Sequence, residues 1–202
     1  MSKKAMKSYH CLQDTILKNI ETVSVKLDKH SNILKISFID TQLGHMLVIS
    51  DDKGICLLEF TDRCRLERKI SMLIFKLEAF IIPGITDIIL SIKDELKAYF
   101  SGKLIKFKTP INLLGSQFQK LVWEELMCIP YGKTQTYAAL GCAIEKPIAY
   151  RAVASANAAN QIAIVIPCHR VINSNGHLGG YAGGVTRKQW LIDHEKKHVS
   201  QY

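Results

Sequence analysis

Residues 166–171 read IPCHRV and place a thiol, Cys168, directly beside an imidazole, His169. Three kinds of chemistry could use this pair. The two side chains could form half of a metal site, a hydrolase could use the thiol as nucleophile with the histidine as its base, or the thiol could serve another reaction. A lone cysteine in an apolar run can also be inert packing.

The spacing disfavours a metal site. Adjacent side chains rarely converge on one zinc ion, and no second ligand pair lies nearby at the usual spacing of about two to five residues. A hydrolase stays open, although neighbouring Cys and His side chains would need a bridging water to act together. The sequence also has no evident oxyanion-hole signature.

Composition and charge restrict the compartment and the partners. The chain has 202 residues, of which 48% are hydrophobic, and its net charge of +9 predicts attraction to nucleic acid. Its six cysteines include no C-x-x-C pair, which predicts reduced thiols in a cytoplasmic protein. No apolar segment follows the basic N-terminus, so we expect no secretory signal, and charges interrupt the most apolar stretch, so we expect no membrane span.

The first half of the sequence predicts a small sheet with helices. Branched and apolar runs at 32–39, 45–50 and 54–60 favour strands, and a turn joins the last two. Residues 62–79 have near-helical apolar spacing, which predicts a helix stopped by Pro83 and Gly84. A second helix is expected over 86–102.

From about residue 110 the sequence predicts capped helices. Ser116 and Gln119 fit a capping box, after which Phe118, Leu121, Val122 and Leu126 should form one apolar stripe. A short helix at 137–144 and an alanine-rich helix at 149–160 follow, and together they are typical either of a helix-turn-helix or of ordinary tight packing. A strand-like run is expected before the thiol and a glycine-rich loop, GGYAGG, after it.

Residues 115–195 closely resemble the O6-alkylguanine-DNA alkyltransferases, including the C-terminal domain of the bacterial adaptive-response protein. The matching stretches are FQKLVWEELMCIPYGKTQTYAAL, RAVASANAANQIAIVIPCHRVI, GGYAGG and RKQWLIDHE. The resemblance implies an α/β (α+β) fold, with a small ribonuclease H-like sheet-plus-helix domain at 1–109. A mostly helical domain with a helix-turn-helix, at 110–202, would bind DNA and perform the transfer.

The resemblance also implies a reaction, in which an alkyl group moves irreversibly from guanine O6 in duplex DNA to the protein's own cysteine. Cys168 matches the nucleophile, and a thiolate suits displacement at a saturated carbon. His169 matches the histidine that deprotonates it through a water, and Glu195 matches the glutamate that orients this histidine. Tyr137 matches a tyrosine that donates a proton toward guanine N3. Each molecule would act once, as a suicide methylated-DNA–protein-cysteine methyltransferase.

Six further residues match positions that bind DNA or the base. The family lays the alanine-rich helix in the minor groove, where Arg151 would fill the gap left by the flipped base and the small Ala152 and Ser155 would permit close approach. Asn160 matches an asparagine that ties this helix to the active-site segment. The remaining two, Tyr181 and Ala182, match the lining of the base pocket.

The resemblance implies no cofactor, and we expect no metal, because six His and Cys residues of the N-terminal half show no recognisable ligand spacing: His10, Cys11, His30, His45, Cys56 and Cys64. The expected partner is double-stranded DNA containing O6-alkylguanine, bound by a monomer, with cooperativity left open. His177, His194 and His198 are expected at exposed positions. The alternative function is non-catalytic recognition of alkylated DNA.

Overall fold

The computed structural model describes residues 17, 18, 20 and 32–199. Four strands form the main sheet, in the order β3-β2-β1-β4. β1 (Asn32–Thr41), β2 (Gly44–Ser50) and β3 (Ile55–Phe60) pair antiparallel, whereas β4 (Ala79–Pro83) lies parallel to β1. The three antiparallel strands confirm the strand predictions, and Asp51 accepts hydrogen bonds from two backbone amides in the predicted turn between β2 and β3.

Helices cover both faces of this sheet, because neighbouring residues of a strand point to opposite sides. Met46 and Val48 of β2 pack in one core with α3 (Asp87–Phe100), whereas Leu47 and Ile49 pack in a second core with α2 (Leu66–Leu77). Thr86 caps α3 as predicted, through its side chain and the amide of Ile89.

The prediction that the first helix continues to Pro83 is wrong. Glu78 has a φ of 47°, which ends α2 in the left-handed conformation, and the apolar residues that follow form β4. Residues 79–82 have side chains that favour a strand, and their backbone pairs with β1. This pairing outweighs the helical spacing of the apolar residues.

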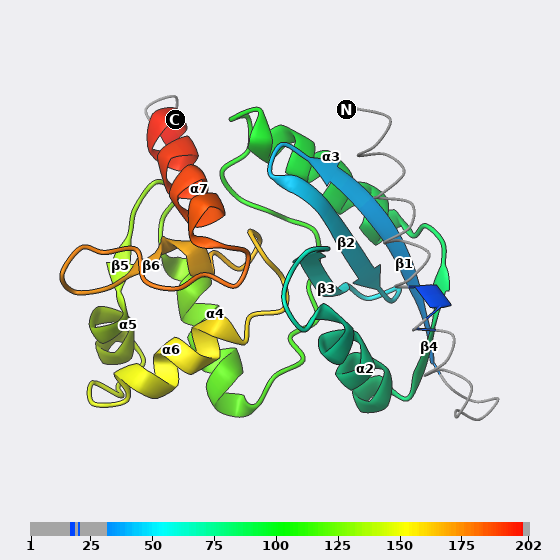
Figure 1. The fold of residues 1–202 in the computed structure, drawn as a ribbon, viewed down its shortest axis with the longest axis horizontal. Coiled ribbons are helices and arrows are strands. Elements are labelled where there is room, and N and C mark those ends of the chain that lie inside the picture. Colours follow the sequence, from blue (N-terminus) through cyan, green and yellow to red (C-terminus); the bar gives the residue numbers. More distant parts are fainter. Residues whose placement is uncertain (1–16, 19, 21–31, 200–202) are drawn as a thin grey trace.

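The second half is mostly helical, as predicted, and lies beside the sheet (Figure 1). Ser116 and Gln119 form the predicted capping box at the start of α4 (Gln117–Cys128). The predicted apolar stripe is wrong at Leu121, which is 41% exposed, because Trp123 is the residue that turns inward and donates to the carbonyl of Ala156. The remaining elements are α4 (Gln117–Cys128), β5 (Gln135–Thr136), α5 (Tyr137–Ala143), α6 (Tyr150–Ala158), η1 (Cys168–Arg170), β6 (Val171–Ile172) and α7 (Val185–His198).

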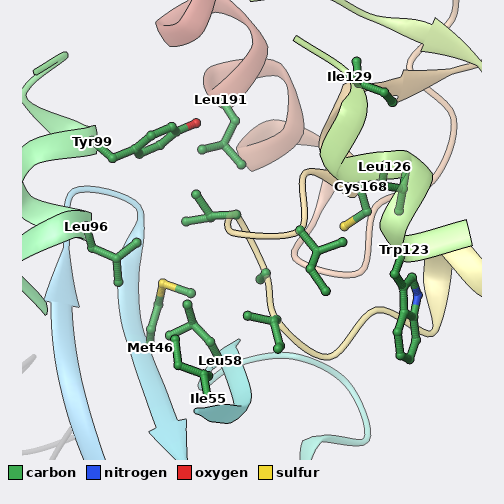
Figure 2. Packing of buried hydrophobic residues seen from close by; sticks show 14 of the residues in the cluster. Met46, Ile55, Leu58, Leu96, Tyr99, Trp123, Leu126, Ile129, Cys168 and Leu191 are labelled. Carbon is green, nitrogen blue, oxygen red and sulfur yellow. The ribbon is translucent and has the colours of Figure 1, made fainter. Parts of the chain in front are cut away.

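One hydrophobic core joins the two halves. Figure 2 shows Met46 and Leu96 of the first half in the same cluster as Leu126 and Leu191 of the second, and Cys168 belongs to this cluster. The segment that carries Cys168 is therefore packed against the sheet.

The edge strand β3 also pairs with the second half. The amide of Leu58 donates to Gln161 at 2.9 Å, and the amide of Ala163 donates back to Leu58 at 2.8 Å. The strand-like run expected before the thiol forms only isolated bridges of this kind, because the chain must bend at Ile164, whose φ is 72°, to reach Cys168. Within the described residues, no helix is long and apolar enough to cross a membrane.

Candidate functional site

A cavity of about 320 Å³ opens over Cys168 between the two halves of the chain. This volume falls within the usual range of small-molecule sites, about 300–1,000 Å³. The wall includes residues from the end of α6, from the glycine-rich loop and from the turn after β3. Its lining residues are Glu59, Arg63, Tyr137, Ala154, Asn157, Ala158, Asn160, Ala163, Cys168, Gly180, Tyr181, Ala182 and Gly183.

The Cys168 thiol is held at the floor of this cavity, where its residue is only 6% exposed. Asn160 donates its side-chain amide to Cys168 Sγ at 3.0 Å and to the carbonyl of Ile166 at 2.9 Å. Burial raises the pKa of the thiol, whereas the Asn160 hydrogen bond and the cations Arg63, Lys188 and Lys69 lower it. The surroundings therefore offset part of the cost of forming a buried thiolate.

His169 lies beneath the cavity and contacts Glu195 of α7. The ring Nε2 and Glu195 Oε1 are 2.8 Å apart, and both side chains are almost fully buried. Because an ionised carboxylate only accepts hydrogen bonds, Nε2 carries the proton and Nδ1 presents a lone pair. Nδ1 has no hydrogen-bond partner within the described part of the chain. Burial lowers the pKa of His169 despite the opposing effect of Glu195, so the neutral, basic form prevails.

Glu195 holds several segments together through one carboxylate. Arg170 donates Nε to Oε2 at 2.9 Å and its terminal nitrogen to Oε1 at 3.0 Å, which makes a two-point ion pair. The hydroxyl of Tyr99 and the amide of Gly132 donate to the same group. Burial acts to raise the pKa of Glu195, but His169 and Arg170 outweigh it and hold that pKa well below its usual range.

Two tyrosines face the cavity from opposite elements. Tyr137 begins α5, which Thr136 caps as predicted, and burial together with the nearby thiol raises the pKa of Tyr137. Tyr181 comes from the glycine-rich loop, and its buried hydroxyl has no partner among the residues described. A Cβ on Gly183 would lie 2.8 Å from the Tyr181 ring, so the loop requires a glycine there. Ala182 completes this wall.

The other predicted DNA-binding residues lie outside the cavity. Arg151, Ala152 and Ser155 are exposed on α6, and the guanidinium of Arg151 lies 5.7 Å from the ring of Tyr150. They share a surface that leads from α6 toward the cavity, since Ala154 and Ala158 of the same helix line its rim.

Sequence reasoning missed four charged residues near the thiol: Glu59, Arg63, Lys69 and Lys188. The first three come from the sheet half, about a hundred residues away in sequence, so no local spacing links them to Cys168. Lys188 is fully buried and donates to the carbonyls of Val171, Leu178 and Gly180. Burial lowers the pKa of Lys188 to about 8, although the thiol opposes this shift.

Two expectations on histidines and metals can be compared with the structure. His177 is exposed, but the prediction for His194 is wrong, because its ring is buried, stacks on Trp190 and bonds to the carbonyl of Tyr99. His10, Cys11 and His30 lie outside the described residues. Within the described ones, no three His, Cys, Asp or Glu side chains gather in a way that could hold a metal ion.

Two family models match this chain. The ribonuclease-like domain of 6-O-methylguanine DNA methyltransferase matches residues 34–113, and the DNA binding domain of the same family matches 117–197. The methylated-DNA–protein-cysteine methyltransferase of Mycobacterium bovis is 48% identical over 106 residues, which are 52% of this chain and 64% of that protein. The chain thus spans slightly less than two thirds of that relative. The protein of the same name from Methanosarcina mazei is 46% identical over 56% of this chain and 72% of its own length.

Solved structures agree with these matches in fold. The crystal structure of Mycobacterium tuberculosis O6-methylguanine methyltransferase is 34% identical, has a TM-score of 0.71 and covers 82% of this chain and 94% of its own. The crystal structure of Mycobacterium tuberculosis OGT in complex with DNA has the same identity and coverage, with a TM-score of 0.69.

Proposed function

This chain belongs to the 6-O-methylguanine DNA methyltransferase family, and from that premise we propose that it repairs DNA by moving the alkyl group of O6-alkylguanine onto its own Cys168. The observation that carries the proposal is the position of this thiol. Cys168 lies at the floor of a cavity, next in sequence to a neutral histidine whose free ring nitrogen is backed by a buried carboxylate.

The residues can account for removal of the thiol proton, for transfer of the alkyl group and for protonation of the departing base. His169 Nδ1 accepts the thiol proton through a water, and Glu195 stabilises the imidazolium that forms. The thiolate attacks the alkyl carbon in line, so the S–C bond forms as the C–O bond breaks. The electron pair leaves with guanine O6, and Tyr137 donates a proton toward N3 of the departing base. A thioether resists hydrolysis, and none of the described side chains that line the cavity offers a route to cleave it, so each molecule reacts once.

The exposed face of α6 is suited to the DNA itself. A modified base inside a duplex is out of reach of a buried thiol, so it must be flipped out, which costs a few kcal/mol. We infer that Ala152 and Ser155 let α6 approach the minor groove, and that Arg151 fills the gap in the stack. Asn160, Tyr181 and Ala182 would then surround the flipped base.

The proposal also covers domain organisation, oligomeric state and cellular location. We propose a first domain at 1–109 and a DNA-binding domain at 110–202, and the change from sheet to helices among the described residues supports this division. We expect a monomer, since one chain carries every residue that the reaction needs. We also expect a cytoplasmic location, where reduced thiols persist. The net charge of +9 supports a DNA partner.

The alternative, recognition of alkylated DNA without transfer, is disfavoured by Cys168. A protein that only binds the lesion would have no need for a thiol held by an asparagine amide in the cavity.

The deciding experiment mixes the protein with excess duplex that contains O6-methylguanine and weighs its cysteine peptides by mass spectrometry. We expect one added methylene unit on the Cys168 peptide, with repair saturating at one lesion per protein. Cys168→Ala should bind the lesion without transfer, whereas Cys128→Ala, at an exposed cysteine, should behave as the wild type. Continued turnover, or repair by Cys168→Ala, would contradict the proposal.

A further inference from the structure

Three charged residues from the sheet half of the chain form a cluster beside the cavity, and two of them, Glu59 and Arg63, line its wall. Glu59 lies near the end of β3 and is 1% exposed, Arg63 follows shortly after this strand, and Lys69 lies on α2. The carboxylate of Glu59 forms ion pairs with Arg63 and, at 3.5 Å, with Lys69. Because one carboxylate faces two cations, the cluster keeps a net positive charge whenever Lys69 is protonated.

Both cations also bind the backbone at the end of α6. Arg63 donates one terminal nitrogen to the carbonyl of Asn160 at 3.1 Å and the other to that of Ala158 at 2.9 Å. Lys69 Nζ donates to the same Asn160 carbonyl at 2.6 Å. Two charge-assisted hydrogen bonds to Asn160, with a third to Ala158, therefore hold the residue whose side chain contacts Cys168 Sγ.

The same residues act on the thiol through their charge. Arg63 and Lys69 both lower the pKa of Cys168, against the dominant effect of burial. Conversely, the thiolate opposes the effects of burial and Arg63, which lower the pKa of Lys69 to about 7. Formation of the thiolate and protonation of Lys69 thus favour each other.

We propose that Arg63 and Lys69, anchored by Glu59, are positioning residues for the nucleophile: they hold Asn160 against the Cys168 sulfur and supply positive charge that favours the thiolate. The inference rests on the proposed function, since it concerns the same nucleophile. By this inference, the sheet half of the chain contributes to the reactivity of the thiol as well as to the fold.

Other groups around the thiol act on it and must be held constant in a test. Lys188 of α7 lowers the pKa of Cys168, whereas Tyr137 of α5 and Tyr181 of the glycine-rich loop have their own pKa values raised partly by the thiolate. The His169–Glu195 pair lies on the remaining side. Substitutions at Arg63 or Lys69 leave these side chains in place, although loss of Arg63 also removes a charge that lowers the pKa of Tyr181.

The test measures ionisation of Cys168 without DNA. For each variant, the ultraviolet thiolate absorbance is titrated against pH and compared with the same variant carrying Cys168→Ser, and the rate of iodoacetamide alkylation at Cys168 is followed by peptide mass. A nearby opposite charge typically shifts a pKa by about one unit or more. We therefore expect Arg63→Gln to alkylate about tenfold more slowly near neutral pH and at close to the wild-type rate at high pH.

Matched variants separate charge from structure. Arg63→Lys keeps the charge and should recover most of the rate near neutral pH, whereas Arg68→Gln removes an exposed cation of α2 and should change nothing. Lys69→Gln leaves the Glu59–Arg63 pair intact and should shift the profile in the same direction, which keeps the test valid if Arg63→Gln folds poorly.

An unchanged titration in both Arg63→Gln and Lys69→Gln would overturn the inference, and so would an equal loss of rate at every pH. Methyl transfer from duplex DNA is measured in parallel. If the wild type failed to transfer methyl groups while the thiol profile shifted as expected, the proposed function would be wrong but the positioning role would stand.

Discussion

Replacing Glu195 with glutamine should both destabilise the protein and slow its chemistry. The substitution keeps the shape of the side chain but removes the charge that faces Arg170, whose side chain is 8% exposed. Breaking a buried ion pair in this way costs about 3–5 kcal/mol, and we take the lower end because one oxygen can still accept hydrogen bonds. For a chain of this size, about 3 kcal/mol corresponds to a fall in melting temperature of about 6–12 °C.

The rate should fall as well, because glutamine can present its amide to His169 and no longer fixes the proton on Nε2. Loss of a correctly held general base typically costs about 10²–10⁴-fold. The assay is single-turnover methyl transfer from an O6-methylguanine duplex, run well below the melting temperature of the variant. Asp193→Asn is the matched control, since it makes the same chemical change at an exposed position of the same helix.

Acid unfolding tests the same ion pair independently. The pKa of Glu195 is lower in the folded state than in the unfolded state, so the pair contributes stability that is fully present above the unfolded value of about 4.3. This contribution is lost as the pH falls through the depressed folded value. The free energy of unfolding should therefore decline less in Glu195→Gln than in the wild type over that acid range. If the variant matched Asp193→Asn in rate, melting temperature and acid response, the reasoning would be refuted.

Three further substitutions test other parts of the structure. Arg151→Ala should slow transfer from duplex DNA about tenfold, because unstacking is no longer compensated, while transfer from free O6-methylguanine stays unchanged; equal slowing of both would contradict a role in flipping. Gly102→Ala should cost more than about 1 kcal/mol in urea unfolding, since Gly102 has a φ of 71° and a Cβ would lie 2.3 Å from the His198 ring. Lys188→Met should cost about 2 kcal/mol by leaving buried carbonyls unpaired, and unchanged stability would show that water replaces the ammonium group.

Local signals in the sequence predicted much of the fold. The capping box at Ser116 and the cap at Thr136 are formed by residues within three positions of each other, so the sequence contains all that they require. The end of α2 was missed because pairing of 79–83 with β1 depends on a strand more than forty residues away. Leu121 was wrongly predicted to be buried, because helical spacing alone does not determine which edge of an apolar stripe packs into the core.

The site likewise contains residues that the sequence predicted and residues that only the structure identifies. Cys168 and His169 are adjacent in sequence, and the family resemblance supplied Glu195, Tyr137 and Asn160, which the structure brings to one cavity or directly beneath it. The resemblance covered only the second half of the chain closely, so it could not supply partners from the first. Only the folding of the chain brings Glu59, Arg63 and Lys69 near the thiol. In the sequence, their charges cannot be distinguished from those of ordinary solvent-exposed residues.

The pairing of β3 with residues 161–163 offers a way to detect the proposed alkylation of Cys168. The amides of Leu58 and Ala163 are held in hydrogen bonds at the edge of β3, and Ala163 lies shortly before Cys168 in the sequence. We expect an alkyl group on Cys168 Sγ to weaken the hydrogen bond from the amide of Asn160, which also donates to the carbonyl of Ile166 in this segment. We expect hydrogen exchange at these two amides to accelerate after alkylation, so that spent molecules can be counted without any label on the DNA.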